Sequence, residues 1–291
     1  MSRIAVELKN VYFKYKNSSS YALSNVSLNI AKGDFVLLVG YSGSGKSTLL
    51  KCINGLIPNF YSGFFGGKVI IEGINTLETE VAKLAQRVGM VFQNPENQLS
   101  SLSVEQEIAF PLENFGVPLQ EMKKRVQELL QLLKIENIRT KSPFSISGGE
   151  QQLTSIAAAL ALDPAILVLD EVTAHLSPRS AMEILTLLNK LNQKYQKTII
   201  ISEHRLDRCI NYASKLIYLE KGKVKACGEP REILQQKSFP KELLPKIPAL
   251  YNQIKAHSLS RDEFSQVDSN FYPLTVPEIM KTLQFGGRRL D

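Results

Sequence analysis

A glycine-rich segment that ends in a lysine and two hydroxyl residues occupies positions 40–48 and reads Gly-Tyr-Ser-Gly-Ser-Gly-Lys-Ser-Thr. Its spacing fits the phosphate-loop pattern G-x-x-x-x-G-K-[ST]. Glycine lets the backbone curl so that successive N–H groups point at one anion. Lys46 can add a positive charge for the β- and γ-phosphates, and the Ser47 hydroxyl can ligate Mg²⁺. The segment therefore predicts a nucleotide site with these candidate contacts: Gly40, Ser42, Gly43, Ser44, Gly45, Lys46, Ser47 and Thr48.

The residues on either side of this loop supply a context that a chance glycine-rich turn would lack. An unbroken apolar run at 35–39 predicts a strand buried on both faces of a parallel sheet. A helix predicted from 46 to about 56 would point the positive end of its dipole at the same anion. Strand, loop and helix together favour phosphate binding over a chance match.

Two adjacent carboxylates, Asp170 and Glu171, follow the apolar run 166–169. Ligands of open α/β sheets bind at the carboxyl ends of the strands, so this position favours a catalytic interpretation. Asp170 could hold Mg²⁺ through water, and Glu171 could orient or deprotonate an attacking water. The alternative is that they cap the helix expected near Pro178. His204 has the same position after another apolar strand, so it could reach the same phosphates.

A second candidate anion site precedes a helix predicted at 152–162, which is rich in Ala and Leu. The turn is Ser147-Gly148-Gly149-Glu150. A serine hydroxyl, glycine N–H groups and a helix dipole together attract an anion.

Two more residues stand at the ends of predicted strands. Tyr15 ends the first predicted strand and could stack on adenine, or it could only cover the edge of a sheet. Gln93 opens a polar loop directly after a short apolar strand at 88–92. The sequence leaves both interpretations of Tyr15 open.

Composition limits the class of protein. The chain has 291 residues, 44% of them hydrophobic and 22% charged, which is ordinary for a globular protein. It has no apolar run near the roughly 18 residues of a membrane span and no signal-peptide core at its start, so we expect it to reside in the cytoplasm. The net charge of +7 is scattered and does not by itself indicate nucleic acid or membrane. The three cysteines, far apart in the chain, predict buried reduced thiols, without zinc or disulfides.

The remaining segments predict the supporting elements. The glycines at 62–67 predict a turn, followed by a strand at 68–71. An apolar stripe at 119–133 predicts a helix that packs on the protein or, alternatively, faces a membrane or partner. Glu220-Lys221-Gly222 predicts a hairpin turn. From about 238 the chain reads as an irregular extension with a short helix at 276–283 and a flexible tail at 286–289.

In this order, the motifs resemble those of the nucleotide-binding subunit of ABC (ATP-binding cassette) transporters over roughly 6–234. The phosphate loop alone is shared with kinases and GTPases, whereas the signature at 147–151 is specific to this family. The resemblance implies an α/β fold: a P-loop NTPase cassette with a RecA-like parallel-sheet core, antiparallel β and helical subdomains. The cassette would span 1–237, with its helical subdomain at about 97–162, and a small C-terminal extension would span 238–291.

The resemblance also implies a role for each motif. Tyr15 would stack on adenine, 40–48 would be the Walker A loop, and Gln93 would open the Q-loop, which touches Mg²⁺ and faces the membrane subunit. Asp170 would be the Walker B acid that binds Mg²⁺ together with Ser47 and Gln93. The catalytic set would be Lys46, Gln93, Glu171 and His204. Ser147, Gly148, Gly149 and Glu150 would bind the ATP held by a facing subunit.

A narrower resemblance is to the ATPase subunits of energy-coupling factor (ECF) transporters, which import vitamins or transition-metal ions. It is carried by Val91-Phe92-Gln93-Asn94-Pro95-Glu96-Asn97-Gln98, by 104–114, by 203–207 and by Pro273-Leu274-Thr275-Val276. It implies ATP and Mg²⁺ as cofactors and a location on the cytoplasmic face of the cell membrane. The implied partners are a second ABC ATPase subunit, a transmembrane coupling subunit near the Q-loop and a substrate-binding membrane subunit, with no nucleic acid.

Two departures from the family pattern leave alternatives open. Leu153 stands where the family usually has Arg, and Ser177 stands where it usually has Asp. Ser177 suggests two unequal sites, as in a heterodimer with a different ATPase. A soluble cassette acting on nucleic acid or ribosomes, and a regulatory cassette that barely hydrolyses ATP, are the other hypotheses. The sequence does not identify the transported solute.

Overall fold

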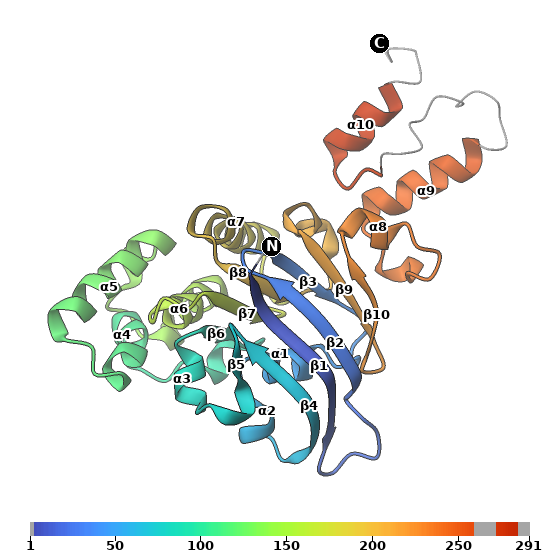
Figure 1. Ribbon diagram of the computed structural model, residues 1–291. Coiled ribbons are helices and arrows are strands. Elements are labelled where there is room, and N and C mark those ends of the chain that lie inside the picture. The colour runs from blue at the N-terminus through green and yellow to red at the C-terminus, as the bar shows by residue number, and fades with distance from the viewer. Residues whose placement is uncertain (1–2, 259–271, 285–291) are drawn as a thin grey trace.

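A computed structural model of the protein describes residues 3–258 and 272–284, and its centre is a six-stranded sheet (Figure 1). The strand order is β10-β9-β3-β8-β7-β6. β10 runs antiparallel to β9, and the other neighbours pair in parallel. The strands are β3 (Phe35–Val39), β6 (Val88–Val91), β7 (Ile166–Asp170), β8 (Thr198–Ser202), β9 (Lys215–Glu220) and β10 (Lys223–Gly228).

Every residue of β3, β7 and β8 is buried, as their unbroken apolar runs predict. Successive side chains of a strand point to opposite faces, so the runs feed two cores. Leu37 packs among the residues of α6 (Gly148–Leu160) and α7 (Pro178–Tyr195), whereas its neighbour Leu38 packs toward α1 (Lys46–Ile53) and the second sheet. Because these three neighbouring strands are parallel, their carboxyl ends lie at the same edge of the central sheet.

The second sheet is antiparallel, with the order β2-β1-β4-β5. Its strands are β1 (Ile4–Tyr15), β2 (Leu23–Ala31), β4 (Gly63–Ile71) and β5 (Ile74–Asn75). The turn predicted at 62–67 is wrong, because β4 starts at Gly63 and pairs there with Tyr15. Gly67 has a φ of +89°, and a Cβ there would lie 2.3 Å from the Asn10 carbonyl oxygen, so this strand position requires glycine.

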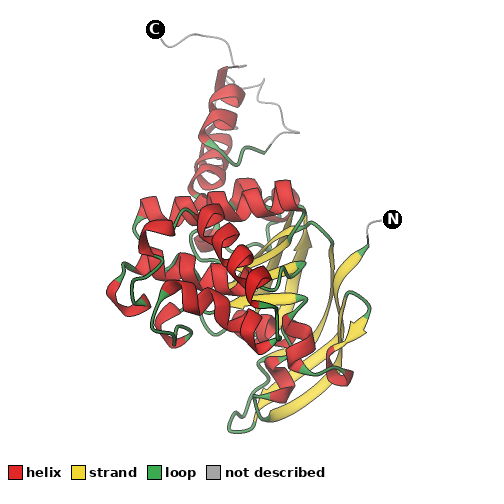
Figure 2. Cartoon of the chain, turned by 90° about the vertical axis from the view of Figure 1, so that its left-hand side faces the viewer, coloured by secondary structure: helices red, strands yellow, loops and turns green. Residues whose placement is uncertain are grey.

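The helices of the cassette cover the central sheet, and α4, α5 and α6 group together at one end of it (Figures 1 and 2). The stripe of α5 buries Val126, Leu129, Leu130 and Leu133 in the core shared with α4 and α6, so the packing interpretation is the correct one for these residues. The helices are α1 (Lys46–Ile53), α2 (Leu56–Asn59), α3 (Val81–Ala85), α4 (Val104–Asn114), α5 (Leu119–Leu133), α6 (Gly148–Leu160), α7 (Pro178–Tyr195) and α8 (Pro230–Leu234).

The C-terminal region is more regular than its prolines suggest. Besides α10 (Val276–Gln284), which the sequence predicted, it contains α9 (Lys246–Ser258), which was not predicted. Arg231 of α8 forms a 2.6 Å ion pair with Glu278 of α10 and so fastens α10 to the cassette. The tail predicted at 286–289 lies outside the described residues. None of the helices in the described part of the chain is both long and apolar enough to cross a membrane.

The cysteines differ in exposure. Cys52 and Cys209 are buried, as predicted, but Cys227 of β10 is exposed. The prediction for Cys227 failed because β10 is an edge strand whose alternate residues face solvent.

Candidate active site

The phosphate loop joins the end of β3 to the start of α1, as the sequence predicted. Gly45 has a φ of +105°, and a Cβ at this position would lie 2.4 Å from the carbonyl oxygen of Ala22. Any other residue would therefore be strained and would collide with backbone. The loop closes on itself through a 3.1 Å hydrogen bond from the Ser44 N–H to the Tyr41 carbonyl oxygen.

Lys46 is buried beneath this loop, with 4% of its surface exposed. Its ammonium donates to the carbonyl oxygens of Gly40 at 2.9 Å and Tyr41 at 3.3 Å. A buried ammonium needs such partners, because burial without them is costly. The Ser44 hydroxyl is buried nearby with no hydrogen-bond partner in the described chain. Buried hydroxyls usually have a partner, and a phosphate oxygen could accept a hydrogen bond from this one.

The Glu171 carboxylate is in polar contact with the side chains of three other candidate residues. Its Oε1 lies 2.7 Å from Nε2 of His204 and 3.6 Å from Nζ of Lys46. Its Oε2 accepts a 3.0 Å hydrogen bond from Nε2 of Gln93. The structure thus brings together all four residues predicted as the catalytic set, around one carboxylate at the carboxyl edge of the parallel sheet.

Asp170 is fixed by Ser202, a contact that was not predicted from the sequence. The Ser202 hydroxyl donates to Asp170 Oδ1 at 2.7 Å and accepts from the Glu171 N–H at 3.0 Å. Because β7 and β8 pair with Asp170 opposite Ser202, the hydroxyl lies between the two acidic residues. The helix-capping alternative is wrong, since α7 is capped by the Ser177 hydroxyl, which accepts from the Ser180 N–H.

Glu203 is a second buried residue beside the site whose contacts were not predicted from the sequence. It is 2% exposed, and its Oε1 accepts from the backbone N–H groups of His204 at 2.9 Å and Arg205 at 3.1 Å. Its Oε2 accepts a hydrogen bond from the Thr173 hydroxyl. Glu203 therefore ties the loop that carries His204 to the loop that follows Glu171. The signal in the sequence was an acidic residue directly after a strand whose three central residues, 199–201, are all isoleucine.

Tyr15 lies beside the first turn of α1, where its hydroxyl is 3.1 Å from the hydroxyl oxygen of Thr48. Its ring packs edge-on against Phe13, with 4.7 Å between centroids. The predicted aromatic is thus adjacent to the phosphate loop, which suits the stacking interpretation without excluding the edge-covering one.

The second candidate anion site forms the N-cap and first turn of α6. The Ser147 hydroxyl donates to Glu150 Oε2 at 2.7 Å, and the Ser147 N–H donates to the same oxygen at 2.8 Å. These bonds lower the pKa of the Glu150 carboxyl, with slight burial opposing them and the Lys141 charge adding to them. Within the residues that the structure describes, no hydrogen bond or ion pair joins residues 147–150 to the phosphate loop, so the two candidate anion sites of one chain are not in direct polar contact.

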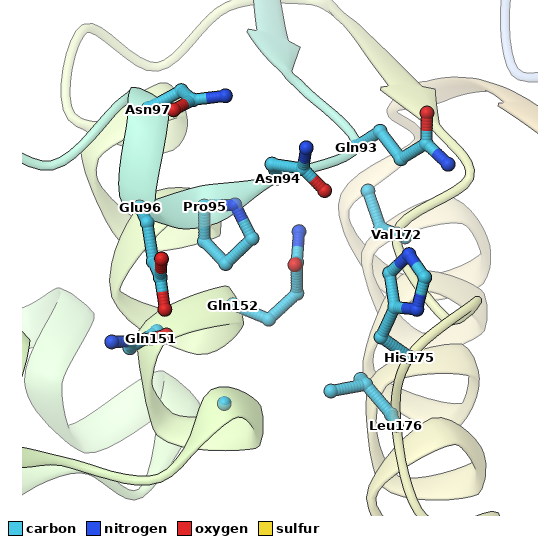
Figure 3. Close-up of a pocket in the computed structure, with 11 residues that line it drawn as sticks. Gln93, Asn94, Pro95, Glu96, Asn97, Gln151, Gln152, Val172, His175 and Leu176 are labelled. Atoms are coloured by element: carbon cyan, nitrogen blue, oxygen red, sulfur yellow. The ribbon is translucent and has the colours of Figure 1, made fainter.

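A cavity of about 370 Å³ lies between the loop that starts at Gln93, the first turns of α6 and the loop at 172–176 (Figure 3). Gln152 is 2% exposed, and its side chain points between these walls. Its amide nitrogen has no partner among the described residues. Pro95 and His175 form opposite sides of the opening.

Comparison with known proteins gives consistent matches. The family model described as ABC transporter matches residues 23–174. A putative ABC transporter ATP-binding protein of Pyrococcus abyssi is 43% identical over 243 residues, 84% of this chain and 87% of the relative. The energy-coupling factor transporter ATP-binding protein EcfA1 of Mycoplasma mobile is 40% identical over 230 residues, 79% of this chain and 82% of the relative. Other relatives are longer, and the chain spans less than half of their length.

Solved structures agree with these matches. The protein cbiO1 of Clostridium perfringens, part of the ABC transporter complex cbiONQ, has a TM-score of 0.73 and 29% identity, covering 87% of this chain and 99% of that chain. The cassette MJ0796, a dimer bound to ADP and Pi after hydrolysis, has a TM-score of 0.68 and 34% identity, covering 78% of this chain and 99% of that chain.

Proposed function

The chain belongs to the ABC transporter family of ATP-binding proteins, and from that premise we propose that it energises an importer of the energy-coupling factor type. As an ABC ATPase of a transporter it binds and hydrolyses ATP. The observation that carries the site assignment is the convergence of Lys46, Gln93 and His204 on Glu171. The importer type rests on the likeness to EcfA1 and to cbiO1.

Glu171 would position the attacking water, and Lys46 would stabilise the γ-phosphate. In-line phosphoryl transfer needs positioning and charge neutralisation more than covalent help. Lys46 already has three oxygen partners in this structure, the third being Glu171. A phosphate would take over this ammonium and so release the Glu171 carboxylate. His204 and Gln93 would then keep the freed carboxylate in place.

The oxygen donors that Mg²⁺ prefers are present at the site: the Ser47 hydroxyl, the Gln93 amide oxygen and Asp170. Asp170 is 5% exposed, and Ser202 holds its Oδ1. This fixed carboxylate fits a divalent cation, which would neutralise phosphate charge when bound. Holding that ion is the role that we assign to the three residues.

A second ATPase subunit would complete each site. The signature residues 147–150 make no hydrogen bond to the phosphate loop in the described chain, so a facing subunit would have to bring the two together. The dimeric cassette MJ0796 supports such an arrangement. Because Ser177 and Leu153 depart from the family pattern, we infer that the partner ATPase can differ from this chain.

Membrane subunits would dock beside the Q-loop. The cavity bounded by 93–97, α6 and His175 offers an opening at that place, and the Gln152 amide nitrogen inside it has no hydrogen-bond partner in the described part of the chain. We assign this opening to a segment of the transmembrane coupling subunit, with a substrate-binding membrane subunit beyond it. The chain would then sit at the cytoplasmic face of the membrane, residues 1–237 acting as the cassette and 238–291 as an extension.

Purification of the tagged full chain from solubilised native membranes tests this proposal. We expect a transmembrane coupling protein and a small hydrophobic substrate-binding protein to co-purify. Glu96→Lys in the cavity wall should reduce their recovery, whereas Glu80→Lys, the same charge reversal on an exposed site outside the cavity, should not. Recovery of no membrane protein, or equal loss in both variants, would contradict the proposed docking.

A further inference from the structure

The segment that follows α8 packs on β9, the strand that pairs with β3, from which the phosphate loop begins. We call residues 239–246 the linker segment. Phe239 is 5% exposed, and its ring centroid lies 5.4 Å from that of Tyr218 in β9. Tyr218 is in register with Val39, the last residue of β3. The linker segment therefore packs on β9 next to the end of β3, where the phosphate loop begins.

One side chain of the phosphate loop is attached to this segment. The Tyr41 hydroxyl donates a 3.1 Å hydrogen bond to Oε2 of Glu242, in the short helix Lys241–Leu243. The carbonyl oxygen of the same tyrosine accepts from Lys46 Nζ and from the Ser44 N–H. Tyr41 thus joins the linker segment to the buried lysine of the phosphate site.

The end of the segment is attached to the loop that carries His204. The backbone N–H of Lys246, the first residue of α9, donates a 2.5 Å hydrogen bond to Oδ1 of Asp207. Asp207 lies in the short helix Leu206–Arg208, directly after His204 and Arg205. Glu203 holds the start of this loop, and the linker segment holds its end.

We propose that the linker segment positions both loops of the active site, with Glu242 acting through Tyr41 and Asp207 acting on the His204 loop. A loop loses conformational entropy when it becomes ordered on binding a ligand. A loop that is already held in place by an anchor does not pay this cost when ATP binds, so the anchor improves affinity without touching the ligand. The orientation of His204 affects turnover instead, because that residue contacts Glu171. The inference rests on ATP binding and hydrolysis, and it does not depend on the importer type or on the solute.

Calorimetric titration of the full chain with ATP tests the first anchor. We expect Glu242→Ala and Tyr41→Phe each to raise the Kd about threefold, since a net hydrogen bond to an exposed charged group is weak. The double variant should raise it no further, because both changes remove the same bond. Glu242→Gln keeps an acceptor and should restore affinity. Lys241→Ala, at the adjacent exposed position, is the control.

The second anchor is tested by the ATPase rate of the full chain. Asp207→Ala should lower kcat about threefold and leave the Kd for ATP unchanged, and Asp207→Asn should restore kcat because its amide oxygen can accept the Lys246 N–H. The inference is overturned if Glu242→Ala and Lys241→Ala give the same Kd, if the two first-anchor changes add, or if the variants only lower the melting temperature while Kd and kcat stay at wild-type values.

Discussion

The Nε2 atom of His204 lies 2.7 Å from Oε1 of Glu171, although the two residues belong to different strand ends of the central sheet. β7 and β8 are parallel neighbours, so the loops that leave them start side by side. The contact places an imidazole and a carboxylate at the same point beside the phosphate loop. Both side chains therefore lie at the edge where open α/β sheets bind their ligands.

The first prediction concerns the carboxylate of this pair. Glu171→Gln should preserve ATP binding and reduce the ATPase rate by at least about 100-fold, because a neutral amide cannot act as a base. The amide can still bond to Gln93 and His204, so the fold should not change. Steady-state phosphate release and calorimetric ATP binding measure the two effects. An unchanged rate would remove Glu171 from the role that we propose.

The second prediction concerns the pH dependence of stability at the start of α6. Hydrogen bonds from Ser147 lower the pKa of Glu150 below its ordinary value of 4.5 in the folded chain. Its stabilising contribution should therefore be complete above that value and should fall as the pH drops through the lowered folded value. We expect Glu150→Ala to cost of the order of 0.5 kcal/mol at pH 7, since an exposed cap is weak, and less near pH 3.5.

Urea unfolding of the wild type and of Glu150→Ala at the two pH values measures this difference. Glu128→Ala, which removes a surface ion pair with Arg125 in α5, provides a comparison at another exposed helix site. A difference for Glu150→Ala that is equal at both pH values would show that the carboxylate charge contributes nothing to the cap.

Local patterns in the sequence predicted the elements that hold the site, and tertiary contacts decided the others. The phosphate loop and the apolar strands are encoded within a few residues, which is why their positions were correct. The helix predicted at 152–162 instead begins at Gly148, because the cap by Ser147 makes Gly148 and Gly149 part of its first turn. The start of β4 was missed because glycines at 63–67 read as a turn, while pairing with β1 makes them a strand. α9 was missed because Pro245 and Pro248 stand at its start, although proline is tolerated in a first helical turn.

The side-chain hydrogen bonds between neighbouring strands were the part of the site that the sequence predicted least well. The sequence placed Asp170, Glu171 and His204 at strand ends, and the structure confirms those positions. It gave no sign that Ser202 would bond to both acidic residues, because that contact depends on the register between β7 and β8. The bond between Tyr41 and Glu242 joins residues 201 positions apart and follows only from the folded chain.

The third prediction concerns the cysteines. Cys227 is exposed, whereas burial strongly raises the pKa of the Cys52 and Cys209 thiols. A thiol reagent should therefore modify only Cys227 in the native chain and all three cysteines after denaturation. The reaction of Cys227 should be slow at pH 7.5, because partial burial of its sulfur raises its pKa as well. Cys227→Ser should abolish native labelling, and residual labelling in that variant would contradict the burial of the other two.

The fourth prediction concerns Glu203, the buried acid that joins the loops of Glu171 and His204. Glu203→Ala leaves two backbone N–H groups and the Thr173 hydroxyl without their partner. We expect it to lower the free energy of unfolding by about 2–3 kcal/mol, because each buried unsatisfied group is costly. The ATPase rate should also fall about tenfold, since His204 would no longer be held against Glu171.

Glu203→Gln separates the hydrogen-bonding role from the charge. Its amide oxygen can still accept from the His204 and Arg205 N–H groups, and its NH₂ can donate to the Thr173 hydroxyl, so stability and turnover should both stay near wild type. Chemical denaturation and phosphate release measure the two quantities in the same preparations. If the Gln variant loses turnover while it remains fully stable, the negative charge of Glu203 acts on the reaction directly, and the positioning role assigned to it is wrong.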